Sequence, residues 1–206
     1  MTVRTPVEAS VLDAAADLLV SEGPHALSIR RIAAAASVAP MSIYNRFESK
    51  AGVLDALFVR GFERLADLRD DLPGPPATPV ERLRAFCLAY RRFALDDPGT
   101  YALMFDRSVV DFEPSPDSLL TAHACFACLV ETVSEVQASG AIVGGDPVEV
   151  GQRVWAALHG AVSLERHGIC FAPDGDQHYA ALVETLLIGL SPAHGLPGGA
   201  TPSRRG

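Results

Sequence analysis

The most informative polar residues lie close together near the N-terminus. Four side chains follow Pro40 at spacings that place them on the outer face of one short helix. Small and polar groups on such a face can enter a major groove about 12 Å wide and contact the edges of base pairs. The chemistry predicted for this face is therefore hydrogen bonding to double-stranded DNA. The four residues are Met41, Ser42, Asn45 and Arg46.

Two short helices joined by a turn would hold this face in place. We expect a first helix over about 6–21, a second, capped by Ser28, to about 35, and a third from Pro40 to about 46. Two short helices packed on a longer one, with a turn of about three or four residues between them, constitute a helix-turn-helix. The apolar positions that would fix these helices together are Ile29, Ile32, Ala33, Val38, Ile43 and Phe47.

The residue identities in this segment are more specific than its periodicity. Leu27–Ala33, Ala36–Pro40 and Ile43–Lys50 together resemble the DNA-binding domain of the TetR (tetracycline-repressor-like) family. The resemblance covers about residues 7–60. It implies that the helix-turn-helix binds DNA as half of a dimer, because two recognition helices must reach successive major grooves about 34 Å apart.

The resemblance implies a role in DNA binding for each residue that occupies a DNA-contacting position of the family's motif. Ser28, at a helix N-terminus, would present its hydroxyl to a phosphate, and Tyr44 would bond a phosphate through its hydroxyl. Lys50 would contact the DNA backbone as a point charge. The alternative is a solvated residue near a helix start, although a lysine there opposes the helix dipole. Arg30 is likewise more typical of a solvated helix face. The predicted DNA contacts are Ser28, Arg30, Met41, Ser42, Tyr44, Asn45, Arg46 and Lys50, of which Met41, Ser42 and Asn45 would read bases.

Three positions depart from the usual family pattern. Gly is usual where Ser37 stands, so Ser37 either strains the turn or adopts a less common one. Ser or Thr is usual where Ala39 stands, so the third helix loses a cap. Arg46 replaces a commoner His and adds a candidate phosphate contact. Tyr44 and Phe47 are expected to belong to the local core.

The net charge of −8 is unevenly distributed. Residues 1–52 carry five basic and five acidic side chains, out of totals of 17 and 25, which leaves 12 basic and 20 acidic groups in the remainder. An acidic body is repelled by phosphate, so only the N-terminal end can face DNA.

Composition and capping signals predict the fold class. Ala and Leu dominate, no stretch alternates apolar and polar residues for long, and about nine helices are expected, so the protein is predicted to be all-α. We predict a DNA-binding domain over 1–52 and a helical effector-binding and dimerisation bundle over 53–190. Residues 72–78 would form a linker, and 191–206 a disordered tail. No signal peptide or membrane span is recognised, so a cytoplasmic location is expected.

The second domain contains a further resemblance. Val154–Ala161 is similar to the Trp-x-x-x-His-Gly signature of one TetR subfamily, which implies a cavity for a small apolar effector. His159 is explained either as a core histidine or as a hydrogen-bond partner of a buried ligand. The candidate pocket residues are Phe86, Tyr90, Phe93, Tyr101, Met104, Phe105, Phe126, Trp155 and His159. No catalytic motif or metal-ligand spacing is present, so no enzyme activity, metal or cofactor is predicted.

The apolar stripes of the last two helices suggest pairing across a two-fold axis. The predicted dimer residues are Val150, Val154, Leu158, Val162, Leu182, Val183, Leu186 and Leu187. The function predicted is a repressor of a pseudo-palindromic operator, released by its effector. The alternative is a small-molecule carrier or enzyme that keeps a degenerate helix-turn-helix.

Overall fold

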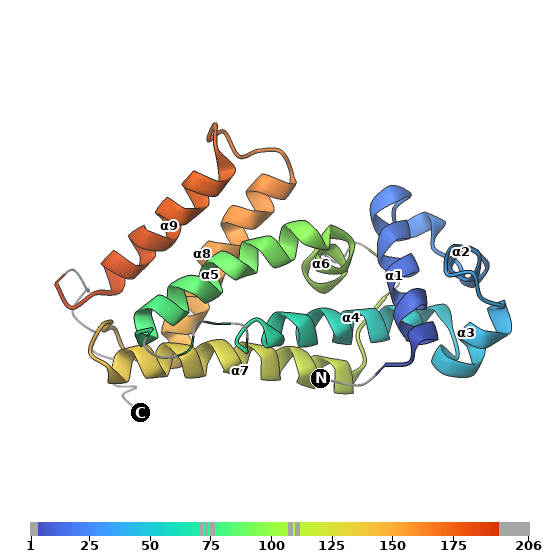
Figure 1. Cartoon of the computed structure of the whole chain (residues 1–206), viewed down its shortest axis with the longest axis horizontal. Coiled ribbons are helices and arrows are strands. Elements are labelled where there is room, and N and C mark those ends of the chain that lie inside the picture. The colour runs from blue at the N-terminus through green and yellow to red at the C-terminus, as the bar shows by residue number, and fades with distance from the viewer. Residues whose placement is uncertain are drawn as a thin grey trace, which may run out of the picture. The chain divides into compact units, whose positions relative to one another are not determined.

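The computed structural model describes residues 4–70, 72, 74, 77–106, 109 and 112–193, and within them every regular element is helical (Figure 1). The α-helices are α1 (Pro6–Ser21), α2 (Ile29–Ala35), α3 (Pro40–Phe47), α4 (Lys50–Asp67), α5 (Pro79–Asp96), α6 (Pro98–Phe105), α7 (Pro116–Ala138), α8 (Pro147–Arg166) and α9 (Gly175–Leu190). A 3-10 turn, η1 (Pro24–Ala26), lies between α1 and α2. The predicted all-α class is confirmed.

The chain divides into two compact units that are not successive segments. The first comprises residues 1–70 and 93–126, and the second comprises 71–92 and 127–206. Helices α5 and α7 therefore each contribute residues to both units. The domain division predicted at residue 52 stays a prediction. Residues 73, 75 and 76 of the predicted linker and 194–206 of the predicted tail lie outside the described residues.

Side-chain caps explain why these helices start where they do. Thr5 and Glu8 form a capping box at the start of α1: the Glu8 amide donates to Thr5 Oγ1 at 3.3 Å, and the Thr5 amide donates to Glu8 Oε2 at 2.7 Å. Thr78 and Glu81 repeat this arrangement before α5. In both boxes the hydrogen bonds from threonine hold the pKa of the glutamate below its usual range. Such contacts satisfy backbone groups that the first helical turn leaves unpaired.

The core of the first unit lies where α1, α2, α3 and α4 meet (Figure 1). Leu12, Ile32 and Ile43 are completely buried there, and so is Val53 at the start of α4. These residues come from four helices, so none of the helices can bury its apolar face alone. The short helices α2 and α3 are held in place by this shared burial.

Helix α6 lies unusually close to α1 and α4. A Cβ atom on Gly99 would overlap with the backbone carbonyl of Ala16 in α1, and one on Gly61 would overlap with the side chain of Met104. Gly99 therefore permits a helix approach that no larger residue allows, whereas a larger residue at Gly61 would require the Met104 side chain to move. Arg60 bonds Asp13 at 2.6 Å, and Arg64 pairs with Asp97, so ion pairs flank both contacts.

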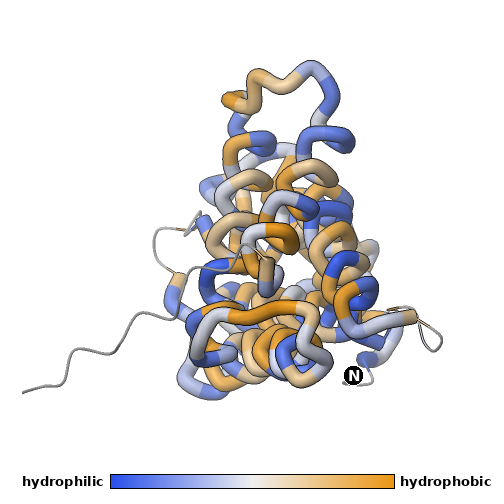
Figure 2. Tube along the Cα trace, turned by 90° about the vertical axis from the view of Figure 1, so that its left-hand side faces the viewer, coloured by the Kyte–Doolittle hydropathy of each residue, from blue (hydrophilic) through white to orange (hydrophobic). Residues whose placement is uncertain are grey.

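The second unit has its own core among α5, α8 and α9. Leu158 and Val162 of α8 and Val183 of α9 are almost completely buried. The Tyr179 hydroxyl donates to the carbonyl of Cys87 at 3.2 Å, and burial raises the pKa of the Cys87 thiol to about 12. In Figure 2 apolar and polar stretches alternate along the helices of this bundle, as expected of amphipathic helices.

Arg91 ties the three helices of this core together. Its guanidinium donates to both carboxylate oxygens of Glu165, at 2.7 and 2.6 Å, and also pairs with Asp176. It lies over the ring of Tyr179, 5.8 Å from the centroid. The hydrogen bonds that Arg91 donates to Glu165 are the main reason that the pKa of Arg91 is raised above its usual value. A bidentate, partly buried pair of this kind is stronger than an exposed one.

One helix among the described residues, α7, is long and apolar enough by length and composition to cross a membrane. Its apolar run is bounded by Asp117 and Glu131. Core helices of soluble proteins pass the same test.

Replacing Gly99 by Ala tests the close approach of α6 to α1. The added methyl group meets a backbone oxygen that cannot move independently, so we expect the free energy of unfolding to fall by about 1–3 kcal/mol in urea titrations. Gly189→Ala is the matched control, because open space surrounds that helical glycine. The control should gain about 0.5–1 kcal/mol. Equal effects of the two substitutions would contradict the proposed role of Gly99.

Candidate nucleic-acid interface

The turn between α2 and α3 is built around Ser37. Its φ angle is +55°, in the left-handed region that favours glycine. The amide of Val38 donates to the carbonyl of Ala33 at 2.9 Å, which closes the end of α2. Ser37 therefore adopts the left-handed conformation that a glycine would adopt in the usual turn. Of the two alternatives that the sequence left open, this is the strained turn. The strain follows from the Cβ of an L-residue in that region.

Helix α3 presents a largely neutral outer face. Met41 is 64% exposed and Tyr44 is 48% exposed, and Asn45 is exposed as well. Ile43 is completely buried and attaches α3 to the core, while Phe47 is half-buried. Tyr44 was expected to belong to the local core, and its exposure shows that this was wrong. Its position, one residue after the buried Ile43, turns it toward the outer face.

The basic residues of this region differ in what they contact. Arg46 Nη1 donates to the carbonyl of Ser42 at 3.0 Å, so the guanidinium folds back along α3. Arg31 pairs with Glu22, whereas the neighbouring Arg30 is exposed. The positive charge of the motif is therefore partly engaged within the protein.

Helix ends position the other candidate contacts. Ser28 caps α2 by accepting the amide of Arg31 at 3.4 Å, and its hydroxyl proton remains available for donation. No side chain caps α3, as expected from Ala39. Ser49 caps α4 by accepting the amide of Gly52 at 3.1 Å, which places Lys50 at the first position of that helix.

Gly52 is a positioning residue that the sequence analysis missed. A Cβ atom at this position would overlap with the carbonyl of Phe47, the last residue of α3. The tight connection between α3 and α4 therefore requires glycine. The positive φ of Glu48, +62°, marks the same sharp turn. A Gly three residues after Ser49, at the start of a helix, is the signal that could have identified it.

The predicted pocket residues fall into both compact units. Phe93, Tyr101, Met104, Phe105 and Phe126 belong to the first unit, and Phe86, Tyr90, Trp155 and His159 belong to the second. In the first unit the ring of Tyr101 lies 4.8 Å from that of Phe105 and 6.3 Å from that of Phe93. In that unit Phe93, Tyr101 and Met104 are buried, which is compatible with ordinary core packing.

A polar chain crosses the second unit between α5 and α8. The indole nitrogen of Trp155 donates to the hydroxyl of Tyr90 at 3.2 Å, and this hydroxyl lies 3.3 Å from Nδ1 of His159. The Tyr90 hydroxyl accepts from the indole, and whether it donates to His159 or accepts from it depends on the histidine tautomer. Tyr90 is buried, and the other two residues are half-buried.

Two family models match this chain. "Bacterial regulatory proteins, tetR family" matches residues 11–57, and "Tetracyclin repressor-like, C-terminal domain" matches residues 83–186. The second match spans about half of the 206 residues. The chain belongs to the TetR family. Membership confirms the resemblance found in α2 and α3, and with it a helix-turn-helix that binds DNA to regulate transcription.

Relatives of this TetR-family regulator cover most of its length. The uncharacterized HTH-type transcriptional regulator Rv0681 of Mycobacterium tuberculosis is 24% identical over 88% of this chain and 80% of its own. A Rhodococcus sp. RHA1 protein of unknown function has a TM-score of 0.77 at 26% identity, covering 91% of this chain and 97% of its own. The fatty acid degradation regulator FadR of Bacillus halodurans has a TM-score of 0.75 at 21% identity, covering 92% and 98%, and shares the fold.

Most of the residues predicted for a dimer interface of this TetR-family regulator are buried within the single chain. The interface itself stays a prediction. The apolar stripe of each helix faces its own unit, a possibility that periodicity alone does not exclude. The buried residues are Val150, Val154, Leu158, Val162, Val183 and Leu187, whereas Leu182 and Leu186 are half-buried.

Ser37→Gly tests the strain in the turn of this TetR-family motif. A non-glycine residue in the left-handed region costs about 1–2 kcal/mol, part of which glycine loses again through its flexible unfolded state. We expect the free energy of unfolding to rise by roughly 0.5–1 kcal/mol in urea titrations. Ser37→Ala keeps the Cβ atom and serves as the control, without the gain. A less stable glycine variant would be inconsistent with a strained Ser37.

Proposed function

We propose that this regulator is a repressor that binds a pseudo-palindromic operator as a dimer and is released by a small apolar effector. The observation that carries the proposal is the outer face of α3, where Met41, Tyr44 and Asn45 are exposed beside a buried Ile43. Exposed residues on a helix that is anchored from behind can enter a major groove without unfolding the motif. Ser28 and Lys50, at the starts of α2 and α4, would hold the phosphates.

In the second unit, effector binding is assigned to Phe86, Tyr90, Trp155 and His159. Trp155, His159 and Gly160 in α8 match the short signature of one TetR subfamily, and Tyr90 adds a polar group in an apolar core. A pocket with apolar walls and a few polar groups suits a small apolar ligand. The effector would have to bind the DNA-free conformation more tightly, since otherwise the equilibrium does not shift.

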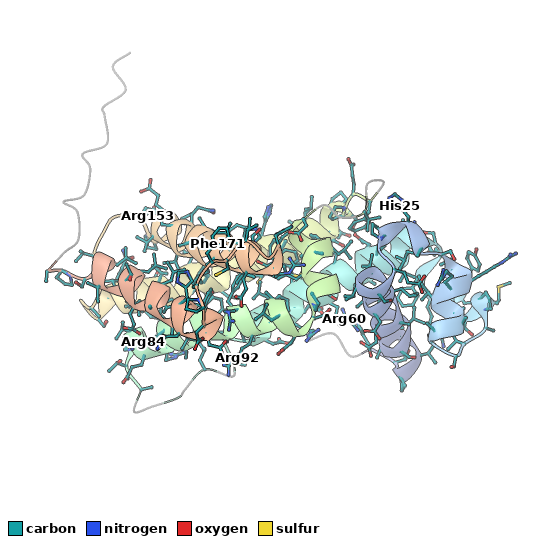
Figure 3. The ribbon with its side chains drawn as sticks, turned by 90° about the horizontal axis from the view of Figure 1, so that it is seen from above. His25, Arg60, Arg84, Arg92, Arg153 and Phe171 are labelled. Carbon is teal, nitrogen blue, oxygen red and sulfur yellow. The ribbon has the colours of Figure 1, made fainter. Side chains whose placement is uncertain are left out.

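Dimerisation is assigned to the surfaces of α8 and α9 that the single chain leaves open. Gly160 has open space around it, so another helix could approach there. Phe171, in the loop between α8 and α9, is 94% exposed (Figure 3). Such apolar exposure is typical of an interaction surface. The exposed residues proposed for the dimer contact are Ala156, Leu164, Ile169, Phe171, Ala181, Thr185 and Ile188.

The alternative is a small-molecule carrier or enzyme with a degenerate helix-turn-helix. The uncapped start of α3 at Ala39 is the observation that favours it. No group of three or more His, Cys, Asp or Glu residues in the described part of the chain could hold a metal ion. Binding of a small molecule without DNA affinity would support the alternative.

We propose a cytoplasmic location for the regulator.

Selection of duplexes from a random DNA pool tests the proposed function. We expect an inverted repeat whose half-sites are centred about 34 Å apart, because the two recognition helices must enter successive major grooves. The double variant Tyr44→Ala/Lys50→Ala should lose this enrichment and keep its circular dichroism spectrum, since Tyr44 is about half exposed. A folded, dimeric protein that enriches no sequence at low salt would refute the proposal.

Ala156→Glu tests the dimer surface. Ala156 is exposed in the single chain, so a carboxylate there leaves the unit folded. Placed at a two-fold contact, it would bring two like charges together, and we expect a monomer in sedimentation velocity measurements. Ala138→Glu, at the exposed end of α7, is the control and should stay dimeric. A dimeric Ala156→Glu variant would exclude this part of α8 from the interface.

A further inference from the structure

We propose that α3 reads an A·T-centred half-site, in which Met41 packs on the methyl group of a thymine and Asn45 bonds an adenine. This inference rests on the proposed function and names the base pairs that the operator must contain.

Met41 supplies the apolar contact. It is 64% exposed on a helix whose buried side is already occupied by Ile43, so the core has no place for it. An apolar side chain in this position gains free energy when a partner removes it from water. Thymine is the base that presents a methyl group in the major groove. The chemistry of Met41 therefore matches thymine.

Asn45 supplies the hydrogen-bonding contact at a fixed distance from Met41. The two residues are one helical turn apart on the same face, about 6 Å along the axis at about 1.5 Å per residue. Successive base pairs are about 3.4 Å apart, so the two contacts fall within about two base-pair steps. The Asn side chain has a donor and an acceptor that match N7 and N6 of adenine.

The arginine of α3 is directed away from base reading. Arg46 bonds the carbonyl of Ser42 and lines a hollow together with Arg4, Glu8 and Glu48. Its charge is also among the causes that lower the pKa of Glu8. Bidentate recognition of guanine needs an arginine fork directed at the base edge. With Arg46 bonded to the backbone of α3, an A·T reading is favoured over a G·C reading.

The test removes single functional groups from the bases of the DNA. Each thymine of the selected duplex is replaced in turn, in both half-sites, by deoxyuridine, which lacks the methyl group. Fluorescence anisotropy should show a loss of about fourfold per half-site at one position, or about fifteenfold for the symmetric duplex. Met41→Ala should abolish this sensitivity. Met41→Leu keeps an apolar side chain and should retain it.

A parallel substitution tests Asn45. Replacing the adenine by 7-deazaadenine removes the N7 acceptor, and we expect at least a fivefold loss for the wild-type protein. Asn45→Ala should bind more weakly and be insensitive to the same replacement. Both residues are exposed, so circular dichroism should show unchanged folding in each variant.

The outcomes separate the two proposals. If no duplex is selected at all, the proposed DNA-binding function fails. If a duplex is selected with G·C pairs at the centre of each half-site, or if deoxyuridine is tolerated at every position by the wild-type protein, the A·T reading is wrong and the proposed function stands.

Discussion

The close approach of α6 to α1 and α4 is the constraint on which the first unit depends. The carbonyl of Ala16 and the side chain of Met104 occupy the space that side chains on Gly99 and Gly61 would need. Since Gly99 meets a backbone atom and the space at Gly61 is filled by the Met104 side chain, α1, α4 and α6 are closely packed. Residues 93–126 thereby join residues 1–70 in one compact unit.

The orientation of α3 follows from this packing. Ile43 inserts into the core that α1 and α4 complete, and Gly52 allows α4 to begin directly under the end of α3. The outer face of α3 is therefore fixed by contacts on its opposite side. A helix of eight residues has little stability of its own, so its exposed residues depend on this support.

Local signals predicted most of the fold because helix starts are encoded locally. Thr5 with Glu8, and Thr78 with Glu81, specify a start through contacts within four residues, and the structure contains both capping boxes. The exposure of Tyr44 and the close contact at Gly99 depend on helices that are distant in sequence. No periodicity reveals them. Likewise, an apolar stripe such as that containing Leu158 looks the same whether its own chain or a second copy covers it.

In both units, polar side chains link helices that are distant in the sequence. In the second unit, Arg91 satisfies Glu165 and Asp176 and stacks on Tyr179, so its charge stabilises the arrangement of α5, α8 and α9. In the first unit, Ser115 and Ser118 at the start of α7 donate to the carboxylate of Asp55 in α4, at 2.9 and 2.8 Å. These bonds, together with the pair between Arg64 and Asp97, link α4 to α6 and to α7.

Under the proposed function, this linkage limits how an effector can act on the reading face. A displacement of α6, or of the start of α7, would move α4 with it, because close helix packing and the part-buried hydrogen bonds of Asp55 resist separate movement. Val53 of α4 is buried in the core that α4 shares with α2 and α3. A movement of α4 would therefore reorient the helix-turn-helix as a rigid body. The spacing between two recognition helices would then change without any change in the contacts that α3 can make. Release from DNA in this way requires no unfolding of the helix-turn-helix.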